Sequence, residues 1–126
     1  MSPELEMELH GKYPKILGYL NEEGKYKTRL WGGFQHGDGW HALVSTLCST
    51  IQARVEATGQ EVQVTQVKEK FGALRFYIQN GDDHISGMID LAEELSARTC
   101  EVCGHPGQKK NVKGWLITRC DEHTPI

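Results

Sequence analysis

The chain has 126 residues, of which 38% are apolar and 25% charged, and its formal net charge is −3. This length predicts one compact domain, or one domain with a small appendage, and the negative balance gives no overall attraction to phosphate. No apolar run reaches the roughly 20 residues that span a membrane, and the acidic N-terminal stretch is unlike a signal peptide, so we expect a cytoplasmic protein without a membrane partner.

The first predicted element is a short helix. Ser2-Pro3-Glu4 combines a capping hydroxyl, a proline suited to the first helical position and an acid near the positive end of the helix dipole. Gly11 and Pro14 predict that this helix ends near residue 12. Four apolar residues that follow are expected in the core: Ile16, Leu17, Tyr19 and Leu20.

A polar loop at residues 21–27 precedes the longest predicted helix, which spans about 39–57 with Asp38 as its N-cap. Apolar residues recur along it at three- and four-residue steps, which is typical of a helix with one buried face. They are Trp40, Leu43, Val44, Leu47, Ile51 and Val55. Thr58-Gly59 closes the helix.

Two strands are predicted next, at residues 61–68 and 73–79, joined by a turn at 69–72. The alternation in the first strand slips at Gln66-Val67, which indicates a bulge or a strand end. In the second strand the alternate apolar residues predict the buried face: Leu74, Phe76 and Ile78.

A third helix follows Asn80-Gly81, capped by Asp82 or Asp83, and its acids are expected to face water. Its apolar stripe consists of Ile85, Met88, Ile89, Ala92 and Leu95. Together these elements predict an α+β core over residues 1–98, with helices packed on a small antiparallel β-hairpin sheet. Residues 99–126 are predicted to form a zinc-binding hairpin packed on that core.

The C-terminal segment carries the most specific motif. Cys100-Glu101-Val102-Cys103 and Cys120-Asp121-Glu122-His123 lie sixteen residues apart. Three thiolates and one imidazole make a closed tetrahedral set for structural Zn²⁺, and each two-residue gap lets both ligands reach one ion from a tight turn. We therefore predict that Zn²⁺ binds Cys100, Cys103, Cys120 and His123 in a zinc-ribbon or knuckle module.

Two alternatives to this site remain open: cysteines that are merely buried, as Cys48 is expected to be, or a disulfide between the two pairs. Because protein side chains fill all four predicted positions, the zinc is expected to be structural, unless His123 swings away and leaves a position open for water. His36, Asp38 and His41 could indicate a second metal or an acid–base pair, but a helix cap and an exposed histidine explain them better. We find no catalytic constellation and expect no enzyme and no small-molecule substrate.

Several phrases carry a family resemblance: Lys12-Tyr13-Pro14-Lys15, Gly37-Asp38-Gly39-Trp40, the segment from Gln66 to Tyr77, and Thr99 to Gly107 with Gly114-Trp115. With these phrases the chain resembles, over nearly its whole length, a family of small proteins encoded by bacteriophages and prophages. The resemblance implies a bacterial host cytosol and an accessory role such as counter-defence, and no assigned activity accompanies it. Small phage accessory proteins often bind a host protein and redirect or inhibit it.

The predicted β-hairpin carries a mixed charged and aromatic patch: Lys68, Lys70, Arg75 and Tyr77, with Glu69 and Phe71. One interpretation is an ordinary solvated sheet face. The other is a surface that binds a host or phage protein, because arginine and tyrosine are favoured interface anchors. We prefer the second interpretation, with the zinc module as part of the same surface.

Nucleic-acid binding is the alternative function. The segment between Cys103 and Cys120 contains four lysine or arginine residues, one tryptophan and no acidic residue: Lys109, Lys110, Lys113, Arg119 and Trp115. Such a loop can follow a phosphate backbone and stack a base. Trp115 could instead be the single core residue of a small ribbon.

Overall fold

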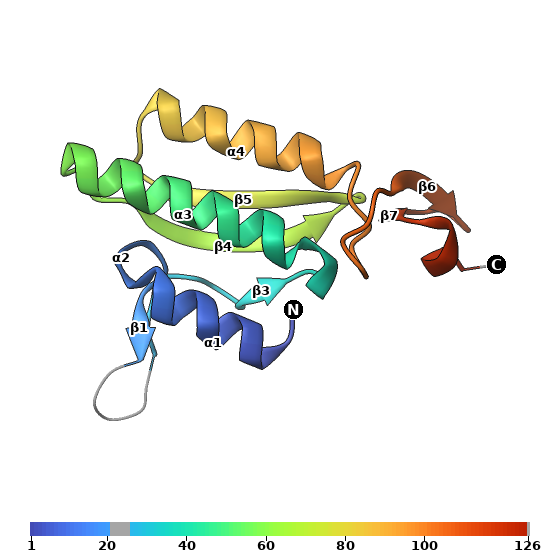
Figure 1. The fold of residues 1–126 in the computed structure, drawn as a ribbon, viewed down its shortest axis with the longest axis horizontal. Coiled ribbons are helices and arrows are strands. Elements are labelled where there is room, and N and C mark those ends of the chain that lie inside the picture. The colour runs from blue at the N-terminus through green and yellow to red at the C-terminus, as the bar shows by residue number, and fades with distance from the viewer. Residues whose placement is uncertain (21–25, 126) are drawn as a thin grey trace.

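The computed structural model describes residues 1–20 and 26–125 (Figure 1). The helices are α1 (Pro3–Lys12), α2 (Pro14–Leu17), α3 (His41–Thr58) and α4 (Asp83–Ser96), with 3₁₀ turns η1 (Asp38–Trp40) and η2 (Asp121–His123). The strands are β1 (Tyr19–Leu20), β2 (Tyr26–Lys27), β3 (Phe34–Gln35), β4 (Gln63–Lys70), β5 (Ala73–Gln79), β6 (Gln108–Val112) and β7 (Trp115–Arg119). Of the predicted loop at 21–27, residues 21–25 lie outside the described part of the chain, and residues 26–27 form β2. The side chains of Tyr19 and Leu20, which were expected in the core, also lie outside the described part.

The main sheet has three strands in the order β3-β4-β5. The predicted hairpin is confirmed, because β4 and β5 pair antiparallel, with a register shift between Val64 and Gln66. The sheet also contains a strand that was not predicted: the two-residue strand β3 pairs parallel to β4, with Phe34 opposite Val67. Such a short strand has no periodicity of its own to reveal it in the sequence.

The turn between β4 and β5 is tighter than predicted. Strand β4 continues to Lys70, so that Phe71 and Gly72 alone form the turn, with φ angles of 54° and 80°. Two consecutive residues with positive φ match the type I′ turn, whose twist suits a hairpin. The carboxylate of Glu69 accepts a hydrogen bond from the Gly72 N–H at 2.7 Å and holds this turn closed.

Side chains cap two of the helices as predicted. Ser2 Oγ accepts from the Leu5 N–H at 3.4 Å at the start of α1, and Asp82 Oδ1 accepts from the Ile85 N–H at 3.0 Å at the start of α4. The prediction that Asp38 caps the long helix was wrong. A 3₁₀ turn occupies residues 38–40, α3 begins at His41, and Asp38 Oδ1 instead accepts from the Ser2 N–H at 2.8 Å.

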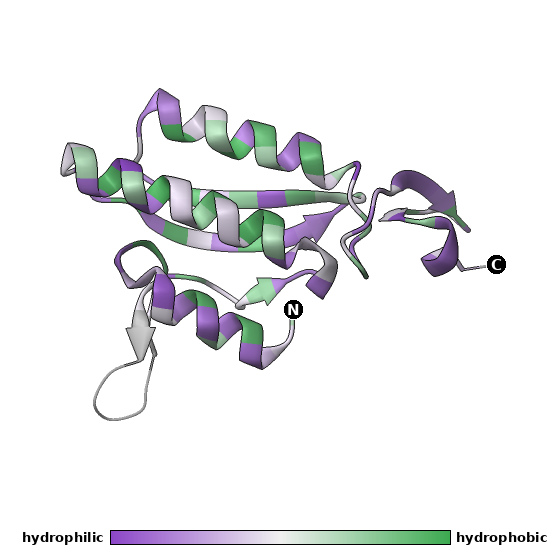
Figure 2. Cartoon of the chain, in the orientation of Figure 1, coloured by the Kyte–Doolittle hydropathy of each residue, from purple (hydrophilic) through white to green (hydrophobic). Residues whose placement is uncertain are grey.

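Helices α3 and α4 lie side by side and run in opposite directions along the main sheet, while α1 lies near β3 (Figure 1). The helices carry bands of both apolar and polar residues, as expected for helices with one buried face (Figure 2). The largest fully buried side chains come from α1, α2, α3, β5, α4 and η1: Leu9, Ile16, Leu17, Ile51, Leu74, Ile85 and Trp40. Among the described residues, no helix is long and apolar enough to cross a membrane.

Helix α4 also protects the exposed edge of the sheet. The β5 N–H groups of Leu74 and Phe76 donate to Ser96 Oγ at 2.8 Å and to Glu93 Oε2 at 3.0 Å. An unpaired edge strand invites pairing with other chains, and these side chains satisfy its donors instead. The expectation that the acids of α4 all face water was therefore wrong for Glu93.

Candidate metal centre

The ligand atoms of Cys100, Cys103, Cys120 and His123 all lie within 4.8 Å of one another. Cys103 Sγ lies 3.8 Å from Cys120 Sγ, and His123 Nδ1 lies 3.1 Å from Cys120 Sγ and 3.8 Å from Cys100 Sγ. The four predicted residues thus converge from two turns that are sixteen residues apart in the sequence. Cys48 stands apart: it is fully buried in the main core, where burial raises its pKa to about 12.

Backbone groups of both turns favour the thiolate form of Cys100. Its side chain is fully buried, and burial by itself opposes ionisation of the thiol. Backbone N–H groups directed at the sulfur, that of Cys120 foremost, outweigh this effect and lower the pKa of Cys100 to about 6. A thiolate is the form that binds a metal, so the backbone geometry favours the ligating form near neutral pH.

The turn from Cys100 to Cys103 packs against the start of the long helix. Glu101 Oε2 accepts from the Gly37 N–H at 2.9 Å, and the Glu101 carbonyl accepts from the Gly39 N–H at 2.8 Å. Trp40 Nε1 donates to the Thr99 carbonyl at 2.8 Å. The segment Gly37-Asp38-Gly39-Trp40 therefore forms the surface on which this turn packs.

The C-terminal hairpin of β6 and β7 also contacts the tip of the main hairpin. Thr118 is fully buried, and its hydroxyl donates to the Gly72 carbonyl. The hairpin itself is mostly hydrophilic (Figure 2). Since it has little apolar surface of its own to bury, its order depends on these contacts and on the Cys/His cluster.

The predicted protein-binding residues lie on one face of the main hairpin. Lys68 is directly opposite Arg75, and Tyr77 is opposite Gln66. Tyr77 is 44% exposed, and Lys70 Nζ lies 5.5 Å from the centre of the Phe71 ring. Because residues two apart on a strand share a face, Lys68, Lys70, Arg75 and Tyr77 all project from the side opposite the buried Leu74 and Phe76.

The predicted nucleic-acid-binding residues divide into two groups. Lys110 forms an ion pair with Asp121 at 2.8 Å, and Arg119 Nη1 donates to the His123 carbonyl at 3.3 Å. Lys109 and Lys113 are exposed. Trp115 is 77% exposed, so it is not the core residue of the hairpin.

The sequence did not reveal a groove between the tips of the two hairpins. This groove has a volume of about 760 Å³, and its lining includes Phe71, Lys70, Glu101, Trp115 and Leu116. Phe71 is 62% exposed, and its φ of 54° is unfavourable for a residue with a side chain. In the sequence, an aromatic residue in a tight turn was the one sign of this groove. The groove itself forms only because the two hairpins, which are distant in the chain, contact each other and both Phe71 and Trp115 line it.

His36, Asp38 and His41 do not form a second metal cluster. Among the described residues, the only group of at least three potential ligands lying close together is the Cys/His cluster. His36 is buried between Phe34 and Trp40. Burial lowers its pKa to about 4, so the imidazole is uncharged near neutral pH. It therefore serves as a core residue.

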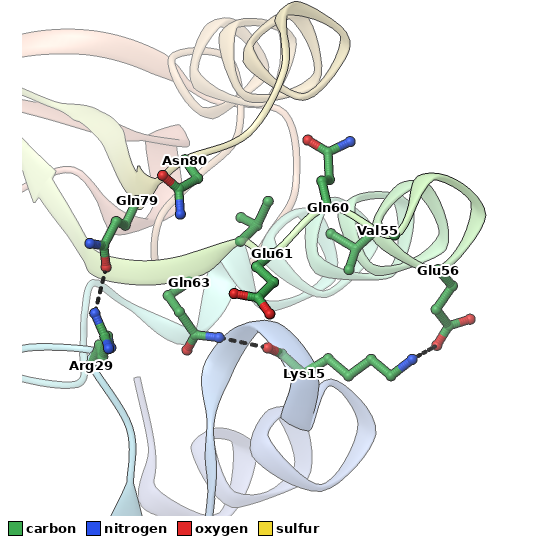
Figure 3. Close-up of a pocket in the computed structure, with 11 residues that line it drawn as sticks. Lys15, Arg29, Val55, Glu56, Gln60, Glu61, Gln63, Gln79 and Asn80 are labelled. Atoms are coloured by element: carbon green, nitrogen blue, oxygen red, sulfur yellow. Dashed lines mark hydrogen bonds and ion pairs between the residues drawn. The ribbon is translucent and has the colours of Figure 1, made fainter.

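A separate polar hollow of about 710 Å³ lies beside the end of α3 (Figure 3). Figure 3 shows its two cations engaged with neighbours: Lys15 Nζ lies 3.8 Å from Glu56, and Arg29 Nη1 donates to Gln79 at 2.8 Å. None of the described residues that line it is a histidine, cysteine or serine.

No family model, curated protein or solved structure matches this chain.

Proposed function

We propose that this chain is a non-enzymatic accessory protein that binds another protein in the groove between its β4–β5 and β6–β7 hairpins, with a structural Zn²⁺ ion stabilising one wall. The observation that carries the proposal is the exposure of Phe71 (62%) and Trp115 (77%) on that groove. Large aromatic side chains are typical centres of binding energy in protein interfaces. Leaving two of them in water at one groove is costly unless a partner covers them.

The choice of Zn²⁺ rests on the donor set and its spacing. A tetrahedral ion with Zn–S bonds of about 2.3 Å has S···S edges of about 3.8 Å. The distance from Cys103 Sγ to Cys120 Sγ is 3.8 Å. Three thiolates and one imidazole also form a closed set that leaves no position for a reacting water, which favours a structural role.

The metal would support the groove directly. Strand β7, which carries Trp115 and Leu116, leads straight into the ligand Cys120. In small zinc modules, metal binding contributes on the order of 10 kcal/mol to folding. Loss of the ion would therefore disorder the β7 wall while leaving the Phe71 wall in place.

The groove points to a partner segment with one or two large apolar side chains flanked by polar residues. Phe71, Trp115 and Leu116 offer the apolar contacts, while Lys70 and Glu101 place charges of both signs beside them. The face with Lys68, Arg75 and Tyr77 adjoins the Phe71 turn and would extend the contact. The resemblance to phage and prophage proteins makes a host or phage protein in a bacterial cytosol the proposed partner.

Affinity capture from bacterial lysate, followed by titration with the captured protein, tests the proposal. Phe71→Ala and Trp115→Ala should each weaken binding about tenfold or more, as expected for central interface residues. Trp31→Ala is the matched control, because Trp31 is 68% exposed and does not line the groove. Capture of no specific protein, or equal binding by all four proteins, would contradict the proposal.

Nucleic-acid binding is the second candidate, favoured by the exposure of Trp115, Lys113 and Lys109. Because Lys110 is already paired, few cations remain for phosphate. The binding constant should therefore decrease with salt concentration, with the log–log slope expected for about two phosphate contacts. It should also be lower for Trp115→Ala, which lacks the stacking ring. Absence of binding to single-stranded DNA and RNA at low salt excludes this function.

A further inference from the structure

A second surface, separate from the hairpin groove, lies along the two long helices. It is a groove of about 390 Å³ between α3 and α4, lined mainly by Leu43, Leu47, Met88, Leu91 and Leu95. None of the described residues that line it is charged. Leu91 is 63% exposed and Leu95 is 45% exposed, although the apolar stripe of α4 predicted Leu95 to be buried. Two leucines, one turn apart, therefore project from α4 into solvent.

The exposed side of α3 next to this groove consists of small residues: Ala42, Thr46, Ser49, Thr50, Ala53 and Ala57. The hydroxyls of Thr46 and Thr50 donate to the carbonyls of Ala42 and Thr46 at 2.8 and 3.1 Å. Their hydrogen-bonding capacity is thus used within the helix, and the surface can be covered without a new polar partner. The result is a shallow, effectively apolar row.

The charges of α3 lie outside this row and have partners of their own. Arg54 pairs with Asp82 at 2.9 Å, and Glu56 pairs with Lys15 at 3.8 Å. Depletion of charge is characteristic of the core of a protein interface.

We propose that two copies of this chain associate through this surface, about a two-fold axis, with α3 and α4 of each copy facing those of the other. A two-fold interface must be complementary to itself. This surface meets that condition because the protruding leucines lie on α4 and the shallow row lies on α3. Leu91 and Leu95 of each copy pack against the Ala42–Ala53 row of the other, and the four helices form one layer-on-layer core.

The dimensions predict a weak dimer. A helix the length of α4, with 14 residues, is about 21 Å long, and two helices about 10 Å apart present a face about 20 Å wide. The projected contact is then on the order of 400 Å² per copy, which lies below the standard size for stable complexes. We therefore expect a dissociation constant in the micromolar range, independent of the hairpin groove.

Sedimentation velocity on the metal-loaded protein, from about 1 to about 300 µM, tests the proposal. The wild-type mass should rise from that of the 14.2 kDa monomer towards twice that value. Leu91→Glu on α4 and Ala53→Glu on α3 should each shift the midpoint at least tenfold to higher concentration, because each buries a charge in the contact. Ser86→Glu is the control, since it adds the same charge at an exposed position of α4 that does not line the groove.

All four proteins should show the same helical circular dichroism, because Leu91, Ala53 and Ser86 are exposed in the monomer. A wild-type protein that remains monomeric over the whole range overturns the proposal, whether or not the groove accepts a helix from another protein. A dimer that Leu91→Glu and Ala53→Glu leave intact also overturns it. The hairpin variants Phe71→Ala and Trp115→Ala should dimerise like the wild type, which separates this inference from the proposed function.

Discussion

Gly39 and Cys100 lie in contact where the Cys100–Cys103 turn meets the start of α3: a Cβ atom on Gly39 would lie 2.2 Å from the carbonyl oxygen of Cys100. The neighbouring Gly37 is equally confined, with a Cβ position 2.4 Å from the Glu101 carbonyl oxygen. The two glycines therefore allow the backbone of the Cys100–Cys103 turn to approach the helix closely. This contact connects the Cys/His cluster to the main domain.

Gly39→Ala is accordingly expected to destabilise the fold by about 2 kcal/mol or more, because two backbone segments must move apart. Gly87→Ala is the matched control: Gly87 lies within α4 with nothing near its Cβ position. That change should stabilise the helix by about 0.5–1 kcal/mol. Urea unfolding of the three proteins measures both effects, and equal stability of Gly39→Ala and wild type would show that the close approach is unimportant.

Phe71→Asn is expected to raise stability and lower partner binding at the same time. Phe71 has a φ of 54°, a conformation that asparagine tolerates much better in a type I′ turn. Relief of this strain should add up to about 1 kcal/mol to the free energy of unfolding. The variant also removes an exposed aromatic ring from the groove, so affinity for the captured partner should fall about tenfold.

Such opposite effects would indicate that Phe71 is kept in the turn for function rather than for folding. Unfolding midpoints and binding isotherms measured on the same preparations test this. A variant that binds as tightly as the wild type would contradict the role of Phe71.

Asp82 makes stability depend on pH. The Ile85 N–H, the Gln60 amide and the Arg54 guanidinium lower the pKa of Asp82 from 3.8 to about 2. A carboxyl group with a lowered native pKa stabilises the fold fully above its unfolded value and ceases to do so as the pH falls through the native value. The melting-temperature difference between wild type and Asp82→Ala should thus be constant near neutral pH and shrink between pH 3.8 and about 2.

Arg54→Gln keeps the Asp82 cap and removes the ion pair. The melting-temperature difference between wild type and Arg54→Gln should therefore show part of the same decrease at acidic pH. Thermal melts at closely spaced pH values give the comparison. A difference between wild type and Asp82→Ala that stays constant across the acidic range would show that Asp82 has an ordinary pKa.

Cys103→Ser should disorder the segment after Arg98 without unfolding the main core. The core residues of α1, α3 and the main sheet contribute no ligand, whereas the C-terminal hairpin depends on the cluster. Limited proteolysis should then cleave within residues 99–126, as should treatment of the wild type with a chelator. Cys48→Ala is the control, because Cys48 lies in the main core, away from the cluster; it should keep the tail protected.

The sequence predicted that three cysteines and His123 would lie close together, because the spacing within each turn is a local property. It also predicted α3, α4 and the main hairpin, whose hydrophobic periodicities extend over many residues. It missed features that depend on distant contacts: the parallel strand β3, the engagement of Asp38 by Ser2, and the use of Glu93 to satisfy the edge of β5. The groove was missed for the same reason, because Phe71 and Trp115 are distant in the chain and meet only when Thr118 docks on Gly72.

The central claim is that four protein side chains enclose one Zn²⁺ ion and leave it no position for chemistry. X-ray absorption spectroscopy on protein purified without added metal, with elemental analysis of the same sample, tests this claim most directly. We expect one zinc per chain with three sulfur and one nitrogen neighbours, the sulfurs at about 2.3 Å. A sample without stoichiometric metal, or a coordination shell that includes a solvent oxygen, would contradict the account.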